Sequence, residues 1–405
     1  MSTPATLRLA SGQGRLLAAL ALAAAMPVWS TAAYSIASGL VLVAWVVLRP
    51  WRDRGACVPP LFLLALGVFA ALLLPSVLAA PDRAAAFEEY RSYYPFLFLV
   101  LAPAGVPDFR SLAFLARCFL LSAAIAACVA LLQAGGLLPW AESRVSGTVG
   151  IFEYAAVMVF AWLVAAVRFA WTDDRRDALV SWLLSLLFLA ALTLNATRAA
   201  VLALLAGYLV LLLFGVRRRR LVLFVLPLLL GAPVVLWTPL GDRLAKADHE
   251  FSLVAPNSQR QAIWAHAWAM VEDHPVLGVG PGDFAAHCAE LKGDERLAGF
   301  PRLRHSYHTA HSVYLHLLAT SGVVGLLGFL AWLALVVAWF LRRRRDLPLV
   351  AAGALSLLAA VLAFGLTDMS LLNSRISGLL ALGLGAAAGC IQCGSVAPLR
   401  ATSEP

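Results

Sequence analysis

The sequence has few charged residues: Asp, Glu, Lys and Arg make up 13% of its 405 residues, about half of the share usual in a soluble domain. Hydrophobic residues make up 62%, and the mean hydropathy is +0.85. A chain of this composition cannot cover itself with polar surface, so lipid must form part of its solvent. The composition excludes an ordinary soluble protein. The net charge of +9 therefore indicates membrane topology and not nucleic-acid binding.

Several motifs that would indicate other protein classes are missing. Five of the six cysteines lie in or beside apolar runs, so no disulfide framework is expected. Cys390 and Cys393 have C-x-x-C spacing without a second pair, and we expect them to be small residues at helix contacts and not a zinc or redox site. No phosphate-binding loop for ATP is present. No Asp-x-Asp pair that could hold a divalent ion lies in the segments expected outside, so neither a metal nor another cofactor is expected.

Long apolar runs dominate the chain. A helix needs about 20 apolar residues to cross a bilayer. Twelve runs are expected to do so, the first two being one run divided near Pro27: 15–31, 33–48, 60–80, 92–105, 111–134, 150–171, 178–196, 199–216, 221–239, 311–341, 347–367 and 371–393. The sequence therefore predicts an all-α, polytopic membrane protein of about twelve transmembrane helices.

The distribution of basic residues predicts the orientation. With the N-terminus inside, alternate loops hold 19 of the 31 Lys and Arg residues but only 7 of the 22 acidic residues, as the positive-inside rule requires. Both termini and both four-arginine tracts, 217–220 and 342–345, are then cytoplasmic. In chain order we expect spans one to nine in 1–239, one large periplasmic loop with short helices in 240–310, spans ten to twelve in 311–393, and a cytoplasmic tail in 394–405.

The loop 240–310, together with the start of the next span, contains all eight histidines of the chain. Asn257 and Ser258 are good cap residues for a helix that runs to about Asp273. A helix with Trp on one face suits the membrane surface. The residues expected on that face are Arg260, Trp264, Ala267, Trp268 and Val271.

Five polar residues are expected on the outer side at similar depth: Arg144, Arg198, Arg260, His311 and Asp368. Each has an ordinary explanation, because arginines snorkel to headgroups, a histidine can be hydrogen-bonded at the interface, and an aspartate can cap a helix. Together they suggest chemistry. Guanidinium groups bind phosphate oxygens in bidentate fashion, and a neutral histidine can take a proton from a sugar hydroxyl. The set suits a diphosphate carried on a lipid.

A metal site remains an alternative for His305, His308 and His311, which are spaced by three residues. Ser306 and Thr309 indicate, however, that a helix begins within this segment. We expect no metal there.

At these residues the sequence resembles the O-antigen ligases, within the superfamily that also contains O-antigen polymerases and bacterial O-linked protein oligosaccharyltransferases. The resemblance extends from about residue 140 to 370. It is carried by Arg-Val-Ser-Gly-Thr-Val-Gly at 144–150, Thr-Leu-Asn-Ala-Thr-Arg-Ala at 193–199, Arg-Gln-Ala-Ile-Trp at 260–264, His-Pro-Val-Leu-Gly-Val-Gly-Pro-Gly-Asp-Phe at 274–284, His-Ser-Val-Tyr at 311–314 and Ser-Gly-Val-Val-Gly at 321–325. Thr197 stands where members commonly have Ser, and Glu153-Tyr154 stands near the place of a Pro-Asn pair.

The resemblance implies an inverting, metal-independent glycosyltransferase of the bacterial inner membrane, of the GT-C-like class, with a periplasmic active site. The implied donor is O-antigen on undecaprenyl diphosphate, and the implied acceptor is a sugar hydroxyl of the lipid A–core oligosaccharide. By position, Arg198 and Arg260 would bind the diphosphate and His311 would act as the base. The residues expected to contribute further to substrate binding are Arg144, Asp368, Tyr314 and Trp264.

Other activities share parts of this pattern. A polymerase would use the same donor to extend another lipid-linked glycan, and a protein oligosaccharyltransferase would modify Ser or Thr. A flippase of the lipid-linked sugar would also use a basic cavity, but a carrier needs ionisable groups along the membrane path, and most spans carry none in their cores. We favour a ligase because the large loop is modest in size and no soluble domain follows the last span.

Overall fold

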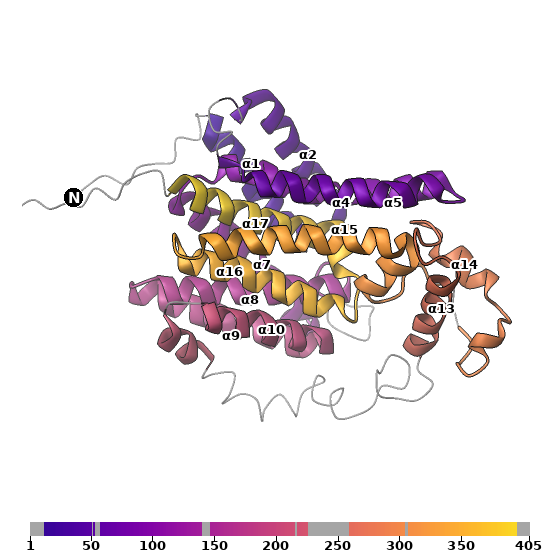
Figure 1. The fold of residues 1–405 in the computed structure, drawn as a ribbon. Helices are drawn as coiled ribbons and strands as arrows, with labels where there is room; N and C mark the ends of the chain where they lie inside the picture. Colours follow the sequence, from indigo (N-terminus) through magenta and orange to yellow (C-terminus); the bar gives the residue numbers. More distant parts are fainter. Residues whose placement is uncertain are drawn as a thin grey trace, which may run out of the picture.

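The computed structural model describes residues 12–50, 52, 57–139, 146–214, 217–225, 259–303 and 307–394. Every regular element among them is helical (Figure 1). In chain order they are α1 (Gly12–Ala25), η1 (Met26–Val28), α2 (Thr31–Leu48), α4 (Pro60–Ala79), α5 (Arg83–Ser92), η3 (Tyr94–Leu97), α6 (Phe98–Gly105), α7 (Phe109–Ala134), α8 (Ile151–Trp171), α9 (Arg175–Asn195), α10 (Arg198–Phe214), α13 (Gln259–Asp273), α14 (Phe284–Glu290), η4 (Glu295–Leu297), α15 (Val313–Arg343), α16 (Pro348–Gly365), η5 (Ser370–Leu372) and α17 (Ser374–Gly394).

The prediction of an all-α polytopic membrane protein is confirmed. Among the described residues, eight helices are long and apolar enough to cross a membrane: α2, α4, α7, α8, α9, α15, α16 and α17. Two shorter apolar segments, 12–28 and 198–214, coincide with two more of the expected spans. Most of the expected span 221–239 lies outside the described residues.

The expected span 92–105 is not one continuous helix. It begins at the end of α5, continues as the short 3-10 helix η3, and ends as the eight-residue α6. Pro95 stands at the start of η3 and Pro103 lies inside α6. Because proline lacks an N–H group and clashes with the preceding turn, a long regular helix is disfavoured here. The expected division near Pro27 is present, since η1 separates α1 from α2.

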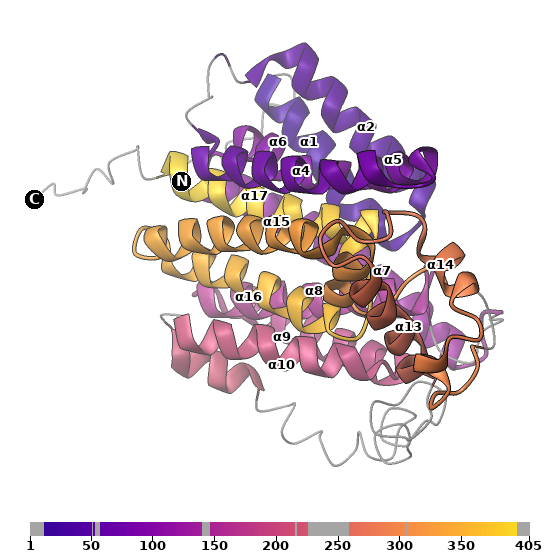
Figure 2. The same cartoon turned by 45° about the vertical axis from the view of Figure 1, so that its right-hand side comes forward.

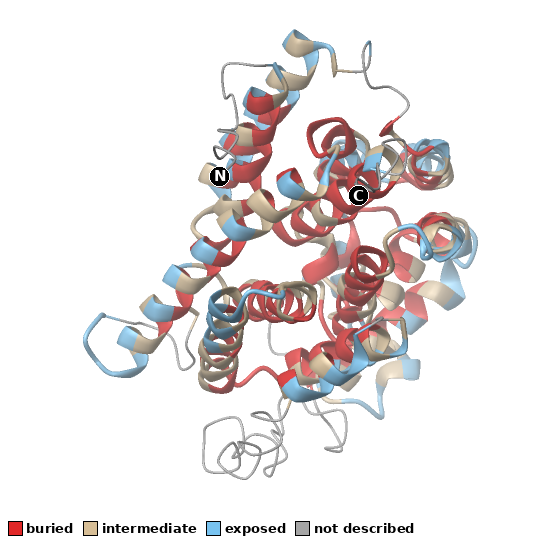
Figure 3. Ribbon diagram, turned by 90° about the vertical axis from the view of Figure 1, so that its left-hand side faces the viewer, coloured by how far each residue is buried: buried red, intermediate tan, exposed pale blue. Residues whose placement is uncertain are grey.

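Burial separates the interior of the bundle from its outer faces. Pairs of helices that pack closely include α10 with α16, α15 with α4, and α17 with α6. Ribbon segments inside the bundle are coloured mainly as buried, and the exposed residues lie toward its outside (Figure 3). Many exposed side chains of α2 and α4 are large and apolar, for example Val47 at 68% and Leu78 at 60% exposure. Such faces suit contact with lipid chains.

The two ends of the bundle differ in chemistry. At one end Arg217 and Arg220 both donate to Asp173, at 2.9 and 2.7 Å. The guanidinium of Arg344 lies 6.0 Å from the ring of Phe214, so both arginine tracts occupy this end. The opposite end carries α5, α13 and α14 (Figures 1 and 2). The structure thus places the two tracts on one side, as the charge distribution requires, and the described part of the large loop on the other.

Helix α15 is broken at Gly322, which has φ 64° and ψ −169°. The segment before α14 fills the break, because the N–H groups of Val323 and Val324 bond to the carbonyl oxygens of Pro275 and Val276, at 2.9 and 3.2 Å. In return, Gly280 N–H donates to the carbonyl of Thr320 at 2.9 Å. Segment 274–284 therefore anchors the large loop to α15 through main-chain hydrogen bonds.

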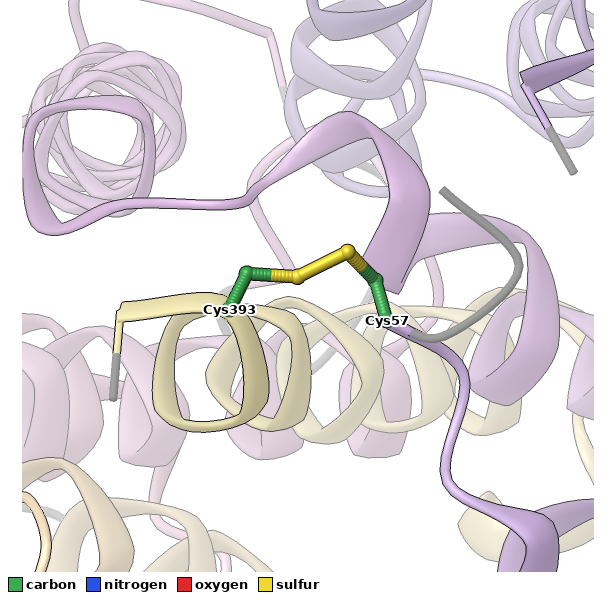
Figure 4. The surroundings of a disulfide bond; sticks show 2 residues. All are labelled: Cys57 and Cys393. Atoms are coloured by element: carbon green, nitrogen blue, oxygen red, sulfur yellow. A yellow bond between two sulfur atoms is a disulfide. The ribbon is translucent and has the colours of Figure 1, made fainter. Parts of the chain in front are cut away.

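The expectation that Cys393 is only a small residue at a helix contact is wrong. Cys57, just before α4, and Cys393, in the last turn of α17, form a disulfide with Cα atoms 5.6 Å apart (Figure 4). The two residues are 336 positions apart in the sequence, so only the packing of the bundle brings them together. Cys390 is a buried free thiol, in agreement with a packing role.

Candidate functional site

Arg198 is the first residue of α10 and follows the sharp corner that ends α9. The buried Asn195 amide donates to the carbonyl of Ile151, the first residue of α8, at 3.1 Å. Thr197 Oγ1 donates to Asn195 Oδ1 at 2.5 Å. Ala196 has a left-handed backbone with φ 56°, a conformation that costs a non-glycine residue on the order of 1–2 kcal/mol. This corner holds Arg198 at the end of the bundle where α8 begins.

Arg260 is the second residue of α13, which packs against α14 and α15. Trp264 Nε1 donates to the carbonyl of Ala310 at 2.9 Å, and Ala310 directly precedes His311. Apolar side chains of the loop and of α15 form a small second core at this place: Ile263, Ala267, Met270, Val279, Phe284, Cys288, Ala310 and Ala319. The packing of α13 thus brings Arg260 to His311.

The predicted end of α13 at Asp273 is confirmed, whereas Asn257 and Ser258 lie outside the described residues. In Figure 1 the helix runs crosswise to α15. The expected membrane-facing stripe is wrong for Ala267, which is fully buried in the second core, while Trp268 is 53% exposed. Sequence periodicity predicted the helix but not the face that it buries, because the core that receives this face comes from segments far along the chain.

His311 does not open the next helix, as the sequence suggested. It lies two residues before α15, whose N-cap is Ser312, and its backbone is left-handed with φ 49°. Burial, together with the charges of Arg260 and His316, lowers the pKa of His311 to about 4. Its imidazole is therefore neutral at pH 7 and can accept a proton. A strained backbone at a non-glycine residue is a feature that often marks a functional position.

Asp368 lies between α16 and η5 and is 4% exposed. Its Oδ1 accepts hydrogen bonds from the N–H (2.8 Å) and the hydroxyl of Ser370. Burial is the main cause that raises the pKa of Asp368 to about 6, and the Glu153 carboxylate contributes to the rise. The hydrogen bonds from Ser370 and the charge of Arg260 oppose the rise. Arg260 thus lies within electrostatic reach of both His311 and Asp368.

Replacing Asp368 with asparagine should stabilise the folded protein at pH 7. The folded pKa of about 6 exceeds the usual 3.8, so the folded protein binds this proton more tightly than the unfolded chain. Stability therefore falls as pH rises from about 4 to 6 and stays lower above that range. Asparagine removes the buried charge, can keep both bonds from Ser370, and should add about 1–3 kcal/mol at pH 7. Thermal unfolding in detergent at pH 7 and pH 4 measures the gain, which should vanish at pH 4.

The exposed Asp346 at the other end of the bundle provides the matched control, since Asp346→Asn should change the unfolding midpoint little at either pH. A lower midpoint for Asp368→Asn at pH 7 would show that the carboxylate makes a stabilising contact and does not carry an uncompensated burial cost.

Two charged residues of this end were missed by the sequence analysis as parts of a site. Glu153, in the first turn of α8, lies 3.5 Å from Arg375 of α17 and accepts a hydrogen bond from Asn373 at 3.1 Å. Arg375 is 8% exposed. Glu153 also contributes to the raised pKa of Asp368. An arginine inside the expected span 371–393 is the sequence signal that could have identified the pair, because a charged residue within a membrane span needs a partner.

A second carboxylate approaches from α5. Glu89 Oε1 lies 3.4 Å from His316 Nε2 and accepts a hydrogen bond from Tyr93 OH at 3.4 Å. Burial alone would raise the pKa of Glu89, but the contact with His316 and the hydrogen bonds from the Gly282 main chain and Tyr93 together lower it. His316 is also one of the groups that lower the pKa of His311. The contact therefore fixes α5 to α15 beside the candidate site.

The remaining expected residues, and the histidines of the alternative metal site, are only partly placed at this end of the bundle. Trp264 and Tyr314 lie at this end, but their polar atoms bond to the chain itself, Tyr314 OH donating to the carbonyl of Leu362 at 2.8 Å. Arg144 and His305 lie outside the described residues. His308 is exposed. Over the described segments no group of three His, Cys, Asp or Glu side chains is placed to hold a metal ion.

Comparison with known proteins adds one match. Residues 183–330 match the family model described as O-antigen ligase. No curated protein sequence matches the chain significantly. The matched region contains the Arg198 corner, α13 with Arg260, His311 and the broken first half of α15. The chain is thus a multi-pass membrane protein that contains an O-antigen ligase domain, at residues 183–330.

Proposed function

We propose that the protein transfers O-antigen polysaccharide from undecaprenyl diphosphate to a sugar hydroxyl of the lipid A–core oligosaccharide, at the periplasmic face of the bacterial inner membrane. The observation that carries the proposal is the position of Arg260, whose charge acts on both His311 and Asp368. A permanent cation beside a neutral imidazole and a carboxylate offers a phosphate-binding group and proton acceptors at one place.

Arg198 and Arg260 are the proposed ligands of the diphosphate. Each guanidinium presents a planar set of donors that matches phosphate oxygens in pairs. As the bond between the anomeric carbon and the diphosphate oxygen breaks, negative charge develops on the leaving group. Fixed cations aimed at that charge lower the barrier, because they are already oriented before reaction.

His311 is the proposed general base. The acceptor hydroxyl attacks the anomeric carbon from the side opposite the diphosphate, which inverts the configuration. The hydroxyl proton passes to the neutral imidazole, and the diphosphate leaves with the electrons of the broken bond. Asp368, Glu153 and Arg375 lie at the same end and are proposed to bind and orient the sugars.

The site should be periplasmic, since the opposite end carries both arginine tracts. A reporter that is active only in the cytoplasm should be active when fused after Arg220 and inactive when fused at Gly293. A periplasmic reporter should give the reverse pattern. The same compartment for both fusions would contradict the topology and the position of the site.

Lysine substitutions test the guanidinium role. Arg198→Lys and Arg260→Lys keep the charge but lose the planar pair of donors, so transfer should fall roughly 30- to 1,000-fold, equivalent to about 2–4 kcal/mol. Membrane levels should stay normal. Arg83→Lys is the matched control, because Arg83 is an exposed arginine of α5 at the same end. Near-full activity in both site variants would leave only a snorkelling role.

The decisive experiment reconstitutes the reaction. Purified protein is given undecaprenyl diphosphate-linked glycan and lipid A–core in the presence of EDTA, and glycan on the core is measured. Transfer supports the proposal. Extension of a second lipid-linked glycan without transfer to the core would indicate a polymerase, modification of a protein hydroxyl an oligosaccharyltransferase, and movement of the donor across vesicles without transfer a flippase.

A further inference from the structure

A cavity of about 460 Å³ lies between α7, α8, α16 and α17, near the end that carries the arginine tracts. Its walls are mainly apolar, and include Leu112, Phe119, Phe160, Val164, Leu357 and Leu382. The volume falls within the roughly 300–1,000 Å³ of small-molecule sites. Because its lining differs from the candidate active site and it belongs to the other end of the bundle, the transfer chemistry does not account for it.

The rim of the cavity is charged. Arg168 donates to Asp177 at 2.7 Å, and Arg117 lies 3.9 Å from the same carboxylate with its side chain 62% exposed. The other acidic residue at the rim, Asp173, is bound by the two arginines of the 217–220 tract described above. The charges that line the cavity cancel, two arginines against two aspartates. Arg217 and Arg220, which bind Asp173 from beside the cavity, add the surplus of positive charge at this rim.

Aromatic side chains mark the depth of the rim. The rings of Phe109 and Trp171 stack with centroids 4.1 Å apart, and both residues line the cavity. Tryptophan is enriched where a membrane protein passes from lipid chains to headgroups. The apolar body is then at the depth of acyl chains and the positive rim at the depth of lipid phosphates.

We propose that this cavity is a binding site for an anionic phospholipid, which inserts an acyl chain between α7, α8, α16 and α17 and places its phosphate against Arg117. The charge of the rim selects the occupant, because a zwitterionic lipid lacks the net negative charge that the surplus of guanidinium groups favours. Basic pockets between transmembrane helices on the cytoplasmic side bind anionic headgroups in this way.

Two variants test the contact with the acyl chain and the contact with the lipid headgroup separately. Gly383 lines the cavity, and a Cβ there would meet only Leu357, at an ordinary 3.5 Å. Gly383→Leu should therefore fill part of the cavity without breaking α17. Gly67→Leu is its matched control, since Gly67 lies in membrane helix α4 with nothing within 4 Å of a Cβ. Arg117→Gln removes the exposed cation and leaves the cavity intact.

The experiment is native mass spectrometry of the full-length, delipidated protein titrated with phosphatidylglycerol or phosphatidylcholine of identical chains. Wild type should retain phosphatidylglycerol preferentially. Gly383→Leu should lose at least about ten-fold in affinity for it, Gly67→Leu should keep it, and Arg117→Gln should reduce the preference about five-fold. Equal binding of the two lipids, or unchanged binding by Gly383→Leu, would overturn the proposal. Full competition by free glycerol phosphate would also overturn it, because the site would then bind only the anion.

Discussion

Replacing His311 with alanine should lower the turnover of polysaccharide transfer by about 10²- to 10⁴-fold, the usual contribution of a general base. Binding of the donor should change little, because the diphosphate is assigned to Arg198 and Arg260. Turnover and donor affinity, measured separately on purified protein, check both parts of this expectation. The lowered pKa of His311 means that the unprotonated form needed for catalysis is already dominant at pH 7.

His308→Ala is the matched control, because His308 is an exposed histidine three residues earlier in the same segment. It should retain most of the activity. If His305, His308 and His311 variants all failed alike, or if a chelator abolished wild-type activity, the general-base role would be wrong and a metal site at these histidines would explain the result better.

The pH profile distinguishes His311 from Asp368. Both groups are expected to act unprotonated, so activity should fall as pH drops. Asp368, with a pKa of about 6, gains its proton first, and His311, with a pKa of about 4 in place of 6.5, gains its proton last. Wild-type transfer should therefore decline through about pH 6. In Asp368→Asn, whose activity is lower throughout, the remaining decline should move to about pH 4.

The apolar runs of the sequence were enough to predict most of the helices in the bundle. Ten of the expected spans coincide with helical segments of the structure, because a run of about 20 apolar residues must cross the bilayer as a helix. The exceptions have local causes or fall outside the described residues. Prolines disrupt the segment 92–105, and most of 221–239 is not described.

The candidate site could be predicted only in part. Alternation of the spans was enough to place Arg198, Arg260, His311 and Asp368 at one end. It could not show that Arg260 acts on the last two, which depends on how α13 packs against α15. The Glu153–Arg375 pair joins the starts of two helices more than 200 residues apart. Such pairings depend on tertiary packing, for which a single sequence carries no periodic signal.

Substituting Gly322 with alanine should prevent the protein from accumulating in a folded form. Its φ of 64° with ψ of −169° lies in a region that only glycine adopts readily. A Cβ there would also lie 2.1 Å from the carbonyl oxygen of Val276 and 2.5 Å from the N–H nitrogen of Leu277. Both contacts are with main chain, which cannot rotate away. The backbone conformation alone costs about 1–3 kcal/mol, and the clash with the anchoring segment adds to it.

Gly39→Ala is the appropriate comparison, because Gly39 lies in membrane helix α2 and a Cβ there meets nothing within 4 Å. That variant should be neutral or up to about 1 kcal/mol more stable, since alanine is the better helix former. Membrane level, a monodisperse gel-filtration peak and thermal midpoint compare the two variants. The Gly322 variant should fail in all three measurements. If it were as stable as wild type, α15 would have to be continuous through residue 322, and the main-chain bonds from Pro275 and Val276 could not anchor the loop as described.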